Sequence, residues 1–142
     1  MRAIIARQGM MFVATSDGFG VCDCTFRAGP PGFVRVLDEC KLVWPEYRGN
    51  GVLASAGNIT ENPHVGLLFP GFIEGRPDLY VNGLADLTDD AEMRAFHPGL
   101  PEDPVPGRRA HLWVTVFVDE AYLAPAARPP CRPARSEICL RA

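Results

Sequence analysis

The run RAGPPGFVRVLDECKLVWPEYRGN, residues 27–50, determines how this chain is expected to fold. Its Gly-Pro-Pro-Gly corner at 29–32 is rigid, because proline fixes φ while glycine accepts turn conformations. The apolar segments 33–37 and 42–45, on either side of Asp38-Glu39, predict a hairpin with a tight turn. The chain is therefore expected to change direction twice within a short distance.

Three arginines of this run, Arg27, Arg35 and Arg48, fall on successive segments. A guanidinium stays charged at any working pH, and its planar fork of donors fits phosphate oxygens. If the three side chains converge, they form an anion site suited to a terminal phosphate. If they do not, they are separate surface arginines, which are the commonest kind. The spacing alone leaves both interpretations open.

Composition limits the classes of protein to consider. The chain has 142 residues, 22% of them charged, with 14 basic against 17 acidic side chains. This length predicts a single domain, and the small acidic excess argues against nonspecific nucleic-acid binding. No apolar run approaches the roughly 20 residues of a membrane span, and no signal peptide is recognisable. We expect a soluble cytoplasmic protein whose partner is a small molecule, not a nucleic acid or a membrane.

Cysteines are odd in number and irregularly spaced, which disfavours a closed disulfide framework. A zinc site would need further ligands at suitable spacing, and none is present. We therefore expect reduced, mostly structural thiols and no metal. The five are Cys22, Cys24, Cys40, Cys131 and Cys139.

Periodicity predicts seven short strands and few helices. A helix is expected from a cap at Asn50 to about Thr60, and a second from Asp89, with Glu92 completing a capping box, to about His97. The last strand is apolar on both faces, which favours burial of one face by a second copy. Together these features predict an antiparallel β-barrel with helical decoration, whose ligand would lie outside, between subunits. The predicted strands are 11–15, 21–27, 33–37, 42–45, 65–69, 79–87 and 110–118.

Four blocks of sequence carry a resemblance to a known family: RAGPPGFVRVLDE (27–39), YRGN (47–50), GNITENPHVGLLF (57–69) and YVNGLA (80–85). In this order and spacing they make residues 11–122 similar to the pyridoxamine 5′-phosphate oxidase-like group of FMN-binding split-barrel proteins. The resemblance implies a mainly β fold, a six-stranded antiparallel Greek-key split barrel, and a homodimer with FMN at its interface. Residues 1–122 would form the flavin-binding domain, and 123–142 an irregular Pro/Arg-rich arm.

The resemblance also implies a set of cofactor-binding residues. Arg27 and Arg35 fall where the family has basic residues near the flavin, and the YRGN block matches the segment that meets the phosphate and ribityl chain. Asn58 could equally be structural, fixing a helix against the barrel. The implied residues are Arg27, Arg35, Trp44, Tyr47, Arg48, Asn50 and Asn58.

Two departures from the family pattern affect the functional prediction. The N-terminal helix is nearly absent, and Glu120-Ala121-Tyr122 is followed by Leu-Ala-Pro instead of the usual closing segment. The resemblance implies an FMN-dependent oxidoreductase that passes hydride through the flavin, with a small organic substrate. The alternatives are a flavin- or haem-binding carrier or sensor, and a structural dimer. Deazaflavin F420 and haem remain less favoured cofactors, and no catalytic residue stands out.

Overall fold

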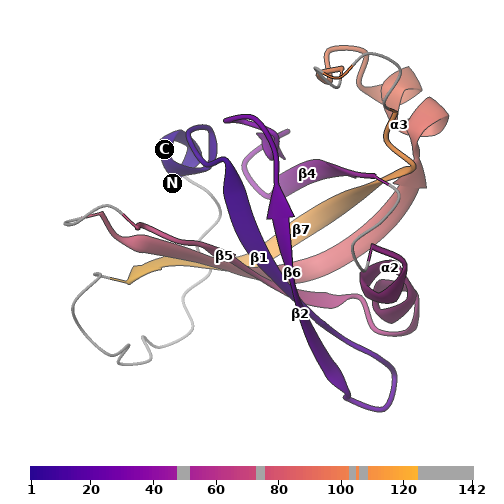
Figure 1. The fold of residues 1–142 in the computed structure, drawn as a ribbon, viewed down its shortest axis with the longest axis horizontal. Coiled ribbons are helices and arrows are strands. Elements are labelled where there is room, and N and C mark those ends of the chain that lie inside the picture. The colour runs from indigo at the N-terminus through magenta and orange to yellow at the C-terminus, as the bar shows by residue number, and fades with distance from the viewer. Residues whose placement is uncertain (48–51, 73–75, 103–104, 106–108, 125–142) are drawn as a thin grey trace.

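The fold is a single antiparallel sheet rolled on itself, seen in a computed structural model that describes residues 1–47, 52–72, 76–102, 105 and 109–124. Seven strands lie in the order β2-β1-β5-β6-β7-β4-β3 (Figure 1). The mainly β fold with few short helices is confirmed, with the seven strands that periodicity predicts and one more than the six that the resemblance implies. The strands are β1 (Met10–Ser16), β2 (Cys22–Ala28), β3 (Arg35–Val36), β4 (Lys41–Glu46), β5 (His64–Phe69), β6 (Asp78–Asp89) and β7 (Leu112–Ala124).

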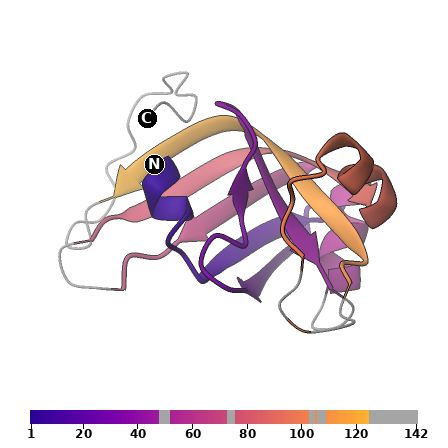
Figure 2. The same ribbon diagram turned by 90° about the horizontal axis from the view of Figure 1, so that it is seen from above.

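Three short helices accompany the sheet: α1 (Arg2–Ile5), α2 (Val52–Glu61) and α3 (Asp90–Phe96). Figure 2 shows α1 and α3 at opposite ends of the rolled sheet. The predicted start of α3 is confirmed, because the Asp89 side chain accepts a hydrogen bond from the Glu92 backbone N–H at 2.9 Å. The proposed cap of α2, Asn50, lies outside the described residues. No helix in the described part of the chain has the length and apolar character of a membrane span.

The Gly-Pro-Pro-Gly corner carries the chain from one end of the sheet to the other, since β2 and β3 are its two end strands. Gly32 has φ +81°, a conformation that favours glycine. A side chain at Gly29 would collide with Phe33. The corner also rests on the segment after α1, where the Gly29 N–H donates to the Gly9 carbonyl at 3.0 Å. These contacts fix the corner that joins the two end strands of the sheet.

Each predicted strand differs from the observed one by at least one residue at one end or both, and two of these differences matter for the fold. The segment 33–37 is strand only at Arg35–Val36, because Phe33 and Val34 leave the corner as core residues. The strand predicted at 110–118 begins at Leu112 and continues to Ala124, passing a bulge opposite Asn82 and Gly83. Leu123 and Ala124, assigned to the irregular arm, are therefore strand, and residues 125–142 lie outside the described part.

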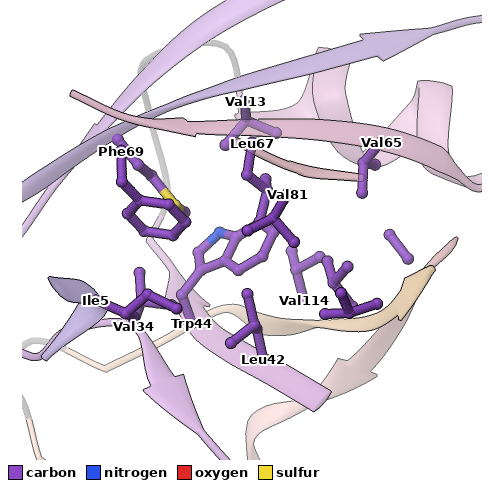
Figure 3. Packing of buried hydrophobic residues seen from close by; sticks show 14 of the residues in the cluster. Ile5, Val13, Val34, Leu42, Trp44, Val65, Leu67, Phe69, Val81 and Val114 are labelled. Atoms are coloured by element: carbon purple, nitrogen blue, oxygen red, sulfur yellow. The ribbon is translucent and has the colours of Figure 1, made fainter. Parts of the chain in front are cut away.

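The barrel interior is filled by its own side chains. Trp44 is fully buried and lies among Leu42, Val81 and Val114 (Figure 3). Each aliphatic or aromatic side chain removed from water in this way contributes roughly 1.5–3 kcal/mol. In the described residues the interior is therefore a packed hydrophobic core, and the position of a ligand outside it stays a prediction.

A second apolar cluster lies on the outer face of the sheet, under α3. Val43 and Trp113 are fully buried there against Met93, Leu100 and Ala110. The chain itself thus covers Trp113, and the expectation that this face of the strand needs a second copy is wrong at that position. Phe117, further along β7, is 44% exposed.

Asp90 joins α3 to the barrel. Its Oδ1 accepts from Trp113 Nε1 at 2.7 Å and from Arg94 Nε at 2.9 Å. Asp90→Ala leaves a buried indole N–H without its acceptor, so we expect the free energy of unfolding in urea to fall by about 1–3 kcal/mol. Asp119→Ala, at an exposed carboxylate, should change it by less than about 0.5 kcal/mol. Equal stabilities for the two variants would contradict this role of Asp90.

Candidate functional site

Arg27, the first residue of the run 27–50, is enclosed by the protein. Arg27 is 7% exposed, and its Nε lies 2.6 and 2.8 Å from the two carboxylate oxygens of Glu46. Its other nitrogens donate to the Thr25 hydroxyl at 2.9 Å, the Phe26 carbonyl at 3.2 Å and the Ser55 hydroxyl at 3.2 Å. All three guanidinium nitrogens therefore have partners within the chain.

This network joins the two ends of the rolled sheet, which no strand pairing connects in the described residues. Arg27 belongs to β2 and Glu46 to β4, two strands that are not neighbours in the sheet. Ser55 adds the first half of α2. Glu46 also accepts from Trp44 Nε1 at 2.9 Å. In the described residues no buried side-chain nitrogen or oxygen lacks a partner, so the interior polar groups are mutually satisfied.

Arg35 lies on the opposite face of the sheet from Arg27. It is exposed and pairs with Val43 of β4, which belongs to the outer cluster under α3. Side chains alternate between faces along a strand, so Trp44 and Glu46 point inward where Val43 points outward. Arg27 and Arg35 thus do not converge, and the structure does not assemble an anion site from these two residues.

Tyr47 follows β4 and is partly buried against the outer cluster. Its neighbours in the predicted site, Arg48 and Asn50, lie outside the described residues. Asn58, on α2, donates from Nδ2 to the Thr15 hydroxyl at 3.0 Å and so fastens the helix to β1. The structure therefore groups Arg35 and Tyr47 on the outer face, and Arg27 and Trp44 inside.

Glu46, Ser55 and Thr25 were not predicted as part of this constellation. Glu46 carried a recognisable signal, because it continues the alternation of Leu42 and Trp44 and so places a carboxylate on the inner face of a strand. A buried carboxylate needs a cationic partner. Nothing local identified which arginine that partner would be.

The cysteines are only partly as expected. Cys22 and Cys24 are free and exposed on β2. Cys40 is disulfide-bonded, so the expectation of reduced thiols is wrong at that position. Among the described residues no three His, Cys, Asp or Glu side chains gather as they would around a metal ion.

A rolled, mainly β sheet with a filled interior defines the class of protein. The family model of pyridoxamine 5′-phosphate oxidase matches residues 1–118, most of the chain. The chain belongs to the pyridoxamine 5′-phosphate oxidase family. No curated protein matches it significantly.

Solved structures share its fold at low sequence identity. HupZ of Group A Streptococcus is 17% identical with a TM-score of 0.61, covering 89% of this chain and 92% of that one. General stress protein 26 of Bacillus anthracis is 17% identical with a TM-score of 0.57, covering 85% and 88%. An F420 reductase is 16% identical with a TM-score of 0.58, covering 85% and 94%. At these identities the likeness establishes the fold alone.

Proposed function

We propose that this protein binds FMN and acts as an oxidoreductase on a small organic substrate. The observation that carries the proposal is membership of the pyridoxamine 5′-phosphate oxidase family over residues 1–118. Flavin supplies hydride transfer when it is bound, and the protein supplies position, electrostatics and shielding from water. This division of labour fits a chain in which no catalytic acid-base pair stands out.

We place the cofactor at the margin of the outer cluster, beside Arg35 of β3 and the end of β4, because α3 already covers Val43 between them. Arg35 is exposed there, and Tyr47 lies four residues beyond Val43, its partner on β4. At 3.3 Å per residue these positions are about 13 Å apart, so they would contact different parts of an elongated cofactor. The chain then continues into Arg48 and Asn50, which we propose as phosphate ligands.

The inward residues receive a different role in this proposal. Arg27, Trp44 and Asn58 have their polar groups engaged with Glu46 and Thr15. We assign them to holding β1, β2, β4 and α2 together beneath the cofactor, without direct contact with it. We further propose that the functional unit is a homodimer with the flavin at its interface.

The visible spectrum of the purified protein tests the cofactor. A yellow protein that releases FMN on denaturation supports the proposal, whereas a bound deazaflavin F420 or a Soret band from haem replaces FMN. Turnover is tested in two steps. NADH or NADPH is added without oxygen and the loss of flavin absorbance is followed, and candidate acceptors are then added to see whether the absorbance returns. If neither nucleotide reduces the bound flavin, or no acceptor reoxidises the reduced flavin, the result favours the carrier or sensor alternative.

Arg48→Ala should weaken FMN binding at least about tenfold, equivalent to 1.4 kcal/mol. The reason is that a charge-assisted hydrogen bond is worth roughly 1.5–3 kcal/mol. Flavin fluorescence titration measures the effect. Arg76→Ala, at an exposed arginine on the loop before β6, is the matched control and should leave the affinity unchanged. Equal affinities for Arg48→Ala and the parent protein, with the fold intact, would remove Arg48 from the site.

A further inference from the structure

The disulfide partner of Cys40 follows by elimination. Cys40 is disulfide-bonded, whereas Cys22 and Cys24 are free thiols. The chain has five cysteines in all, so Cys131 and Cys139 are the two that remain as partners within one chain. Both belong to the C-terminal arm that follows β7, far from Cys40 in the sequence.

The turn that carries Cys40 is held by the chain itself. The Leu37 N–H donates to the Lys41 carbonyl at 2.9 Å. The Cys40 N–H donates to Asp38 Oδ1 at 2.8 Å, and the Cys40 carbonyl accepts from the Val118 N–H at 2.8 Å. Cys40 therefore has a defined position beside β7, and a disulfide at this cysteine brings its partner to the same place.

Both arm cysteines can reach this turn from the end of β7. Ala124, the last residue of β7, is six positions beyond Val118, or about 20 Å at 3.3 Å per residue. Cys131 lies seven positions after Ala124, and an extended chain of that length covers about 24 Å. Cys139 has more than twice as many residues available. The Cα atoms of a disulfide are themselves about 5.5 Å apart, so neither partner requires β7 to move.

The surface around Cys40 is acidic. Asp38 and Glu39 precede it in the turn, and Asp119 follows the residue of β7 that bonds the Cys40 carbonyl; all three are exposed. Lys41 is the basic side chain of the turn, and its Nζ lies 3.5 Å from Asp38 Oδ2. The other two carboxylates form no ion pair within the described residues. This surface therefore has an excess of negative charge.

The arm of residues 125–142 has the opposite charge. It contains four arginines against one glutamate, a net formal charge of +3 on its side chains. Opposite charges at a protein surface attract each other within a Debye length, roughly 8–10 Å at physiological salt. The attraction and the covalent bond thus favour the same position of the arm. The charged residues of the arm are Arg128, Arg132, Arg135, Glu137 and Arg141.

We propose that a disulfide from Cys40 to either Cys131 or Cys139 ties the basic arm to the acidic turn before β4. The bond forms when the two thiols lose two protons and two electrons to a small disulfide such as oxidised glutathione, which becomes two thiols. A reducing thiol reverses the exchange. The arm is therefore tied to the barrel under oxidising conditions and released under reducing ones.

This tether is independent of the proposed function. Cys40 comes directly before β4 and Tyr47 directly after it, so the tether and the proposed flavin site lie at opposite ends of the strand. The experiments below follow cysteines and not flavin. Their outcome and the outcome of the flavin experiments are therefore separate.

Peptide mapping of the full chain tests the bond. The protein is oxidised in a glutathione buffer, its free thiols are alkylated, and the monomer band of a non-reducing gel is digested with trypsin, which does not cut before proline. We expect the Cys40 peptide to be joined to the peptide of Cys131 or of Cys139, and to separate on reduction. An alkylated Cys40, or a link to the peptide of Cys22 and Cys24, would overturn the proposal. The peptides are 36–41 for Cys40, 110–135 for Cys131, 136–141 for Cys139 and 8–27 for the two free thiols.

Two serine variants distinguish this bond from indiscriminate oxidation. Cys40→Ser should abolish the link between the turn and the arm. Cys22→Ser, at an exposed free thiol, is the matched control and should form the link to the same extent as the parent protein. Loss of the link in both variants would contradict the assignment of the bond to Cys40.

The contribution of charge is tested by the equilibrium with glutathione. Glu39→Lys reverses a charge beside Cys40, so we expect the ratio of disulfide to dithiol in a fixed glutathione buffer to fall at least about threefold. The difference should shrink at high salt, which screens exposed charges. Glu102→Lys makes the same change at an exposed carboxylate in the loop after α3 and should match the parent. Equal ratios for the two variants would overturn the attraction between the arm and the turn.

Discussion

Replacing Arg27 with alanine is expected to lower the free energy of unfolding by about 3–5 kcal/mol. The substitution leaves the Glu46 carboxylate buried without its cation, at a side-chain exposure of only 5%. It also removes hydrogen bonds to the hydroxyls of Thr25 and Ser55. Because Arg27 joins two strands that are not sheet neighbours, its loss should open the barrel at the split. Urea denaturation followed by tryptophan fluorescence measures the change, since Trp44 contacts the same carboxylate.

Two further variants separate the buried pair from a general arginine effect. Arg35→Ala, at an exposed guanidinium on β3, should change the free energy of unfolding by less than about 0.5 kcal/mol. Replacing both members, Arg27→Leu with Glu46→Leu, should recover much of the loss, because a well-packed apolar pair can match a buried ion pair. An Arg27→Ala protein as stable as Arg35→Ala would show that the buried pair of Arg27 and Glu46 contributes little to stability.

The local elements could be predicted from the sequence because each has a local cause. The hairpins follow from turn residues between alternating apolar runs, and α3 begins where Asp89 caps it three residues before Glu92. The core side of each strand follows from period-two alternation, as in Leu42 and Trp44. These signals depend only on neighbouring residues.

The arrangement of the arginines could not be predicted in the same way. Arg27 and Arg35 are eight positions apart, an even difference, so simple alternation along one extended strand would place them on one face. The positive φ of Gly32 and the turn around it break that alternation, and the two side chains lie on opposite faces. The pairing of Arg27 with Glu46 depends on how the two ends of the sheet meet, which no local pattern records. For Arg48 and Asn50, the phosphate role stays a prediction.

The second large loss of stability is expected from a substitution at the bulge between β6 and β7, which form the longest ladder of the barrel. The pairing register of β6 with β7 shifts by one residue between Asn82 and Gly83. A Cβ built on Gly83 would collide with the Phe117 carbonyl oxygen and lie 3.0 Å from Val116 Cγ1. A backbone carbonyl in a continuous ladder cannot rotate away as a side chain could. A substitution here must therefore push the two strands apart.

Gly83→Ala is accordingly expected to cost about 3 kcal/mol or more, the upper end for overpacking against a rigid neighbour. Gly57→Ala is the matched control, because a Cβ on Gly57 meets nothing within 4 Å in α2 and should stabilise the helix by roughly 0.5–1 kcal/mol. The two variants thus predict shifts of opposite sign in thermal and urea unfolding. Amide exchange should locate the Gly83→Ala loss in β6 and β7, since separation of these strands exposes their hydrogen bonds. A Gly83→Ala protein that matches the parent in stability would mean that the ladder tolerates a side chain at the bulge.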